Sequence, residues 1–86
     1  MQVHVTGRVQ GVGFRWYAQQ EARRRGVTGW VRNEPDGSVA AVFEGDDDDV
    51  TALVDWCRQG PSSAVVRDVA VTDAAPTGAD VFDVRY

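Results

Sequence analysis

Residues 7–15 read GRVQGVGFR and bring three glycines and two arginines between a short alternating segment and a helical one. Glycine adopts left-handed backbone conformations at little steric cost, so successive amides in such a stretch can point at one ligand. The helix that follows adds the positive end of its dipole. Arg15, in the first turn of that helix, adds a planar cation suited to phosphate or carboxylate oxygens. The segment therefore predicts an anion-binding loop between a strand and a helix.

The residues on either side of this loop have the periodicities of those two elements. Val3 and Val5 alternate with polar residues, as in a half-buried strand, and the alternation stops at Gly7. A helix is predicted over residues 14–25, and Gly26 ends it. The apolar stripe of this helix comprises Phe14, Ala18 and Ala22.

The rest of the chain continues with a hairpin, a second helix and two strands. Residues 27–33 and 38–44 are strand-like runs around residues 34–37, whose proline and Asp-Gly pair favour a turn. A second amphipathic helix follows residues 46–49 and is closed by residues 60–61. Its apolar positions are Val50, Leu53, Val54 and Cys57. The two final strands alternate around Val65, Val69 and Val71 and around Phe82, Val84 and Tyr86.

The predicted order of elements is βαββαβ with one more short C-terminal strand. In 86 residues there is room for one domain, expected to span residues 1–86. The economical α+β architecture is a ferredoxin-like α/β sandwich, with two helices on one face of a mostly antiparallel sheet.

Strand pleating leaves one point open. It groups Asn33 with Val31 and Trp30 with Arg32, without deciding which pair faces the helices. A bulge near Gly29 would reverse the choice. Asn33 is expected at the strand end beside the loop in either case.

Composition and charge exclude several classes of protein. Cys57 is the only cysteine, which excludes an intramolecular disulfide framework. No apolar run is long enough to span a bilayer and no signal-peptide pattern follows Met1, so a cytoplasmic protein without a membrane partner is expected. Residues 1–32 carry six arginines and one glutamate, a net charge of +5, whereas residues 33–86 carry three arginines and twelve carboxylates, a net charge of −9. This asymmetry favours a small anion in the basic half and argues against a nucleic-acid partner.

Several other residues have ordinary structural explanations. His4 alternates with the valines of its strand and has no partner visible in the sequence, so a surface histidine is expected. Residues 46–49 lack the ligand spacing of a calcium loop and are expected to cap a helix. Cys57 lies on an apolar stripe, as a buried small hydrophobe does. The tryptophans are expected to be core or partly buried packing residues, namely Trp16, Trp30 and Trp56.

Two motifs in register make the chain resemble the acylphosphatase family. They are GRVQGVGFR over residues 7–15 and GWVRN over residues 29–33, the second followed by DGSV over residues 36–39 and by Gly45. The resemblance covers essentially the whole chain and extends to the closing FDVRY over residues 82–86. The position after the asparagine, where the family often has threonine, is a glutamate here.

The resemblance implies hydrolysis of acyl phosphates to carboxylate and inorganic phosphate, with no metal and no other cofactor. The essential arginine and asparagine of the family match Arg15 and Asn33. Backbone amides of the loop are expected to hold the phosphoryl group, and these residues are Val9, Gln10, Gly11, Val12, Gly13, Phe14 and Arg15. The side chain of Gln10 is expected to shape the loop through hydrogen bonds. The expected partners are a small acyl phosphate and inorganic phosphate, as product and inhibitor, and the expected oligomeric state is a monomer.

The chemistry of acyl phosphates fits this sparse set of groups. The leaving group is a carboxylate whose acid has a pKa of about 4, so it departs without a proton from a strong general acid. Positioning and charge stabilisation are then the main requirements, as in phosphoryl transfer generally. Asn33 is expected to orient the attacking water, and no side chain of the sequence stands out as a dedicated base.

Two other classes of function remain open from the sequence. One is a non-catalytic ferredoxin-like module that binds or senses a small phosphorylated or anionic ligand. The other is an interaction domain that keeps the fold but has lost activity, which predicts replacement of Arg15 or Asn33. Both residues are present.

Overall fold

The computed structural model describes residues 1–86, and its elements follow the predicted order. Its helices are α1 (Phe14–Arg25) and α2 (Asp47–Gln59). Its strands are β1 (Gln2–Arg8), β2 (Thr28–Asn33), β3 (Val39–Glu44), β4 (Val65–Thr72) and β5 (Phe82–Arg85). None of the helices is both long enough and apolar enough to cross a membrane.

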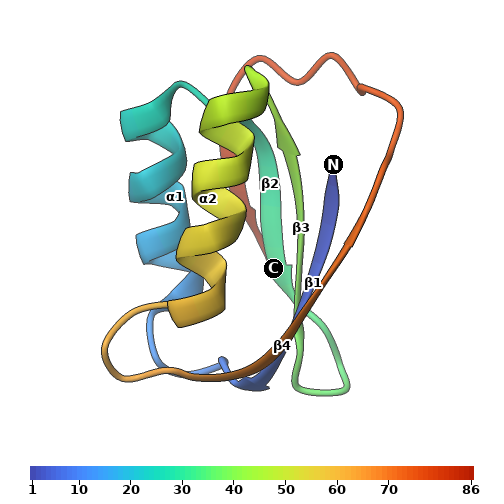
Figure 1. Ribbon diagram of the computed structural model, residues 1–86. Coiled ribbons are helices and arrows are strands. Elements are labelled where there is room, and N and C mark those ends of the chain that lie inside the picture. Colours follow the sequence, from blue (N-terminus) through green and yellow to red (C-terminus); the bar gives the residue numbers. More distant parts are fainter.

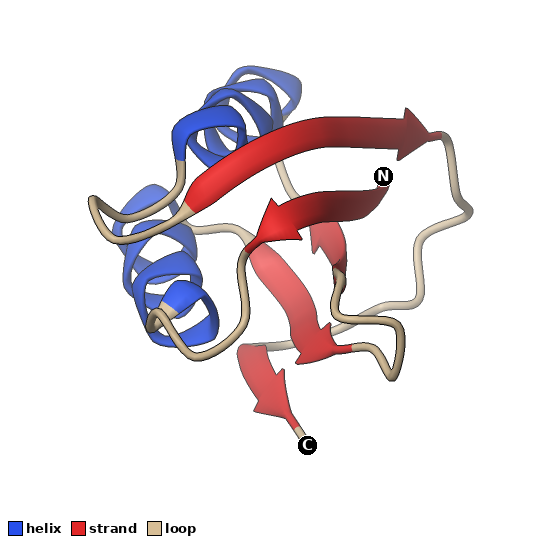
Figure 2. Ribbon diagram, turned by 90° about the horizontal axis from the view of Figure 1, so that it is seen from below, coloured by secondary structure: helices blue, strands red, loops and turns tan.

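The strands form one sheet in the order β4-β1-β3-β2-β5. The pairs β4–β1, β1–β3 and β3–β2 are antiparallel, whereas β2 and β5 are parallel. Both helices cover the same face of the sheet and leave the other face open (Figures 1 and 2). The ferredoxin-like sandwich with a mostly antiparallel sheet is thereby confirmed. The parallel edge strand β5 brings residues from the end of the chain beside β2 and the start of α1 (Figure 1).

The core fills the space between the helices and the covered face of the sheet. The sheet contributes alternate residues of β1 and β3 together with Val31 of β2, among them Val3, Val5, Val39 and Phe43. The helices contribute Phe14, Ala18, Ala22, Leu53 and Cys57. Burial of these side chains is the main favourable term in the stability of the fold. It also fixes the two ends of the residue 9–14 loop, since Val9 and Phe14 belong to the same core.

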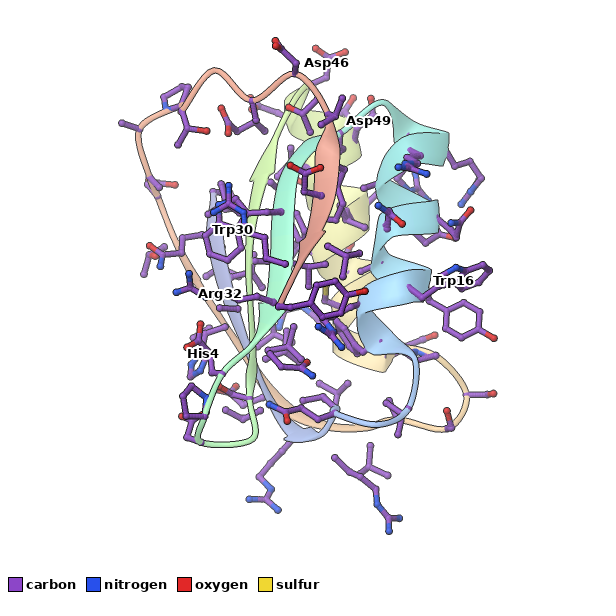
Figure 3. The ribbon with its side chains drawn as sticks, turned by 180° about the vertical axis from the view of Figure 1, so that it is seen from behind. His4, Trp16, Trp30, Arg32, Asp46 and Asp49 are labelled. Atoms are coloured by element: carbon purple, nitrogen blue, oxygen red, sulfur yellow. The ribbon has the colours of Figure 1, made fainter.

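The structure settles which face of β2 meets the helices. Val31 is fully buried, and Asn33 lies two residues further on the same face. Trp30 and Arg32 lie on the open face of the sheet (Figure 3). The β2–β3 register runs without a shift from Thr28 to Asn33, so there is no bulge near Gly29.

Gly29 has a different reason for being glycine. Its φ of 131° is a conformation that other residues rarely adopt, and a Cβ atom there would overlap the carbonyl oxygen of Val42 on β3. The residue therefore allows the two backbones to approach closely. This approach keeps β2 in regular register up to Asn33, and hence fixes the face on which Asn33 lies.

Two expectations about individual side chains need correction. Trp16 is not a packing residue, because 58% of its surface is exposed and it projects outward from α1, whereas Trp30 and Trp56 are half-buried as expected (Figure 3). Asp46 occupies the N-cap position of α2 but makes no side-chain hydrogen bond there. The acidic run therefore acts on α2 through its charge near the helix N-terminus.

Candidate active site

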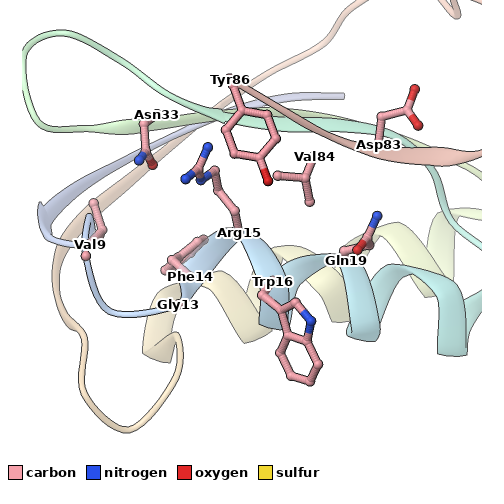
Figure 4. A pocket seen from close by; sticks show the side chains of 11 residues that line it. Val9, Gly13, Phe14, Arg15, Trp16, Gln19, Asn33, Asp83, Val84 and Tyr86 are labelled. Carbon is pink, nitrogen blue, oxygen red and sulfur yellow. The ribbon is translucent and has the colours of Figure 1, made fainter.

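A cavity of about 440 Å³ opens where the start of α1 meets the ends of β2 and β5 (Figure 4). Residues from all three regions of the chain line it. The lining consists of Val9, Gly11, Gly13, Phe14, Arg15, Trp16, Gln19, Asn33, Asp83, Val84 and Tyr86. The cavity thus joins the glycine-rich loop to the end of the second strand, the two regions that the sequence analysis selects.

The backbone of the loop is suited to bind an anion. Gly11 and Gly13 have φ values of 73° and 80°, in the left-handed region that favours glycine. Of the ten backbone hydrogen bonds outside helices and strands, none has its donor in residues 10–13. These amides are therefore available to oxygens of a ligand, and successive amides in such a loop form a concave anion site.

The N-terminus of α1 reinforces this site. Gly13 is its N-cap residue, no side chain caps it, and its first turn contains no acidic residue. The first turn of α2, by contrast, contains three aspartates. The positive end of the α1 dipole is therefore not neutralised by the protein itself and faces the loop.

The loop is held in place at several points. Val9 and Phe14 are buried at its two ends. The side-chain amide of Gln10 donates hydrogen bonds to the carbonyl oxygens of Glu34, at 2.7 Å, and Ser38, at 2.9 Å. The hydroxyl of Ser63 donates to the carbonyl oxygen of Val12 at 3.1 Å. Gln10 therefore shapes the loop as expected, and it also ties the loop to the hairpin turn that follows Asn33.

Arg15 places its guanidinium at the centre of the cavity (Figure 4). Its Nη1 atom donates a hydrogen bond to the carbonyl oxygen of Arg85 at 3.0 Å. Its Cζ atom lies 4.7 Å from the centre of the Tyr86 ring, within the range of a cation–π contact. A guanidinium has five N–H donors, so these contacts orient the group and leave donors for an anion.

Asn33 is the last residue of β2, and its half-buried side chain points into the cavity across from Arg15 (Figure 4). The next residue, Glu34, does not line this cavity. Its carboxylate instead pairs with Arg32, which lies on the open face of the sheet, at 2.7 Å. The Glu34 carboxylate is thus directed away from this cavity.

A chain of polar side chains supports the hairpin turn from the open face. The Ser38 hydroxyl donates to the Asp36 carboxylate at 2.5 Å, and the Ser38 amide donates to the same oxygen at 2.9 Å. These hydrogen bonds, helped by the charge of His4, lower the pKa of Asp36 below its usual value. His4 does have a partner, because its Nε2 atom lies 2.6 Å from the Ser38 hydroxyl. The exposed histidine therefore belongs to the support of the turn.

The cavity collects most of the predicted site residues and adds others. Gln10 and Val12 do not line it, since their side chains point to the hairpin and to the core. The residues that sequence analysis missed are Trp16, Gln19, Asp83, Val84 and Tyr86. Gln19 lies four residues after Arg15 and so on the same face of a helix, which is a signal that the sequence did contain. The β5 residues had no such local signal.

Residues outside the cavity give no second constellation of this kind. Histidine, cysteine, aspartate and glutamate side chains nowhere gather in a group of three or more that would hold a metal ion. Cys57 is buried in the core, and this burial raises the pKa of its thiol to about 12. A thiol in that environment is a packing group and not a nucleophile.

The sequence and the fold are both similar to those of known proteins. The acylphosphatase family model matches residues 1–84. An acylphosphatase from Nocardioides sp. is 59% identical over 83 residues, which cover 96% of this chain and 84% of the relative. The crystal structure of an acylphosphatase from Bacillus subtilis is similar with a TM-score of 0.94 at 37% identity, covering 99% of this chain and 96% of that one. The chain therefore belongs to the acylphosphatase family, and it is a hydrolase.

Proposed function

We propose that the protein hydrolyses the mixed anhydride of an acyl phosphate by direct attack of water on phosphorus. The observation that carries the proposal is the position of Arg15 and Asn33 on one cavity with the residue 9–15 loop, whose amides have no protein acceptor at residues 10–13. The loop and Arg15 hold the phosphoryl group, and Asn33 orients the water. The products are a carboxylate and inorganic phosphate.

The phosphoryl group binds as a dianion to the loop amides and to the start of α1. Arg15 contacts two phosphoryl oxygens in the fork geometry that guanidinium and phosphate share. These donors are fixed before the substrate arrives, because Gln10 and Arg85 hold the loop and the guanidinium. Donors that are fixed in advance stabilise the charge of the transition state without reorganising.

The chemical step needs one new bond and one broken bond. The oxygen of the water held by Asn33 attacks phosphorus, and the bond from phosphorus to the acyl oxygen breaks with its electron pair, which leaves on the carboxylate. A phosphoryl oxygen of the substrate accepts the proton of the water. The leaving carboxylate is a weak base and departs unprotonated. The step therefore uses positioning and electrostatic stabilisation, and no side chain is required to act as base or nucleophile.

Every group in this mechanism comes from one copy of the chain, which supports action as a monomer. The loop and Arg15 belong to the basic part of the sequence, whereas residues 33–86 are strongly acidic. This distribution supports a small phosphorylated substrate and disfavours a nucleic acid. Inorganic phosphate, the product, competes for the same loop.

The test is hydrolysis of acetyl phosphate and benzoyl phosphate by the purified protein in the presence of a chelator. We expect Arg15→Gln to lose turnover and phosphate binding together, and Asn33→Ala to lose about 100-fold to 1,000-fold in kcat, as for removal of one transition-state donor. Arg23→Gln, at the far end of the same helix, is the matched control and retains activity. Wild-type rates no faster than the spontaneous reaction would refute the proposal.

The inhibition pattern separates binding from turnover. Inorganic phosphate is expected to inhibit wild type competitively, and Asn33→Ala with a similar inhibition constant, because Asn33 holds water and not the phosphoryl group. Near-wild-type turnover in Asn33→Ala would refute the role of Asn33 while leaving the loop as the anion site. Complete loss of activity on addition of the chelator would refute a reaction that needs no metal.

A further inference from the structure

The direction in which the acyl group leaves can be inferred from the geometry of the cavity. This inference rests on the proposed function. In an in-line displacement the attacking and leaving oxygens lie on opposite sides of phosphorus. Asn33 lies on one side of Arg15, whereas Gln19 and Val84 lie on the other side (Figure 4). With water at Asn33 and the phosphoryl group at Arg15, the acyl group extends between α1 and β5.

The surface on that side of Arg15 is a groove, which we call the acyl groove, formed by Gln19, Val84 and Tyr86. Val84 is half-buried and pairs with Val31 in the parallel β2–β5 register, so its position is fixed by the sheet. The Gln19 side chain is held by its hydrogen bond to the carbonyl oxygen of Phe82 at 3.2 Å. Gln19 and Val84 therefore stand on two regular elements, α1 and β5, and Tyr86 directly follows β5.

The chemistry of the acyl groove favours an apolar occupant. Val84 and the ring of Tyr86 offer apolar surface. Two charged residues line the cavity, Arg15 and Asp83. Arg15 is occupied by the phosphoryl group, and the Asp83 carboxylate points away from Arg15 (Figure 4). A negatively charged acyl group would find no free partner of opposite sign here, whereas an alkyl or aryl group would bury apolar surface that is otherwise exposed to water.

We propose that the acyl groove selects acyl phosphates by the length of an uncharged hydrocarbon group attached to the carboxyl carbon. Acetyl phosphate carries a single methyl group and gains little contact with it. Longer straight-chain acyl phosphates bury successive methylene groups against Val84. Acyl phosphates with a second carboxylate gain no comparable contact.

A homologous series of substrates tests this proposal, since acetyl, butanoyl and hexanoyl phosphates release carboxylates of nearly equal basicity. Differences in kcat/KM along the series therefore report contacts of the acyl chain. We expect kcat/KM to rise about twofold to fourfold per added methylene until the groove is filled. A flat or falling series in an enzyme that hydrolyses acetyl phosphate would overturn the acyl groove and leave the proposed function intact.

Substitutions locate the contacts. Val84→Thr replaces a methyl group by a hydroxyl of similar size, and we expect it to lower the ratio of kcat/KM for butanoyl to acetyl phosphate by about twofold to fivefold. Trp16→Ala is expected to leave the ratios of kcat/KM for butanoyl to acetyl phosphate and for hexanoyl to butanoyl phosphate unchanged, because the Trp16 ring points away from Arg15 and Val84 (Figure 4). Val81→Thr is the matched control, since Val81 is an exposed valine outside the cavity and its change leaves both ratios as in wild type.

Thermal unfolding verifies that each variant folds, and ratios are compared among folded variants. An unchanged ratio of kcat/KM for butanoyl to acetyl phosphate in Val84→Thr would overturn the assignment even if the wild-type series rises. If the wild-type protein hydrolyses no member of the series, the proposed function is refuted, and the acyl groove with it.

Discussion

The ring of Tyr86 packs over the guanidinium of Arg15, with 4.7 Å between its centre and Cζ. Tyr86 is 98% exposed, so this contact is made at the surface and its worth is about 0.5 to 1 kcal/mol. The ring limits the directions in which the guanidinium can point, and a guanidinium that is already oriented loses less freedom when the substrate binds. The last residue of β5 acts on the same group, through the hydrogen bond from Arg15 to the carbonyl oxygen of Arg85.

The first prediction concerns this contact. Tyr86→Ala should lower kcat/KM for acetyl phosphate about twofold to fivefold, which is the loss of one surface cation–π contact expressed as a rate. Tyr86→Phe keeps the ring and should remain close to wild type. Steady-state kinetics of both variants make the test, and equal losses in the two would show that the hydroxyl and not the ring is important.

The second prediction concerns the connection between the loop and the hairpin. Gln10→Glu keeps the shape of the side chain but replaces the donor by a carboxylate, which faces the carbonyl oxygens of Glu34 and Ser38. We expect the free energy of unfolding to fall by about 1 to 3 kcal/mol. We also expect kcat to fall about tenfold to a hundredfold, because small displacements of positioning groups are costly in rate.

The KM and kcat values of Gln10→Glu separate positioning from simple destabilisation. A positioning role also predicts a change in the side-chain amide resonance of Asn33 in a nitrogen-correlated NMR spectrum. Gln20→Glu, on the exposed side of α1, is the matched control for the change of charge. A destabilised Gln10→Glu with wild-type kcat and an unshifted Asn33 resonance would refute the coupling.

The third prediction is a pH dependence of stability at the hairpin turn. The hydrogen bonds from Ser38, and then the charge of His4, lower the pKa of Asp36 from its usual value of 3.8. A carboxyl whose pKa is lower in the folded state stabilises the fold above the unfolded pKa, and this contribution is lost as pH falls through the folded pKa. Asp36→Asn should therefore melt below wild type near neutral pH, and the difference should shrink as pH falls below about 4.

Thermal unfolding from neutral to acidic pH measures this difference. Asp80→Asn, at an exposed aspartate in the loop before β5, is the control and should give a smaller difference at neutral pH. A difference between wild type and Asp36→Asn that stays constant down to the most acidic pH would contradict the prediction.

The fourth prediction concerns the core thiol. Burial raises the pKa of Cys57 to about 12, so at pH 8 only about one thiol in ten thousand is ionised, and the thiol is also shielded. A thiol-specific reagent should leave the native protein unmodified at pH 8 and react with one equivalent after denaturation. Full activity of native protein after such treatment is expected as well. Rapid modification before unfolding would show that Cys57 is accessible.

Local chemistry explains how much of this molecule could be predicted from its sequence. The loop was predictable because glycines at residues 11 and 13 are needed where φ is positive, and Arg15 follows at a helix start. The burial of the face of β2 that carries Val31 was not predictable, since a period of two residues is the same for both faces of a strand. The packing of β2 against the helices determines which face is buried. Asn33 lies on the same face as Val31 and therefore also points toward the helix side of the sheet.

Other features were missed for different reasons. The exposure of Trp16 could have been derived, because Trp16 does not belong to the stripe formed by Phe14, Ala18 and Ala22. The proposed roles of Val84 and Tyr86 depend on the parallel pairing of β5 with β2, which joins residues about fifty positions apart. No local pattern encodes such a pairing, and it becomes visible only when the sheet is assembled.

The parallel pairing also has a kinetic consequence. The anion loop belongs to residues 9–15, whereas the ring that orients Arg15 belongs to residue 86, so nearly the whole chain separates two parts of one site. Contacts between distant segments form late, because a long loop has to be closed before they contribute. During refolding, full turnover should therefore return with the slowest phase, after helix content and after the β2–β3 hairpin. We therefore expect the complete site to be among the last parts of the molecule to form.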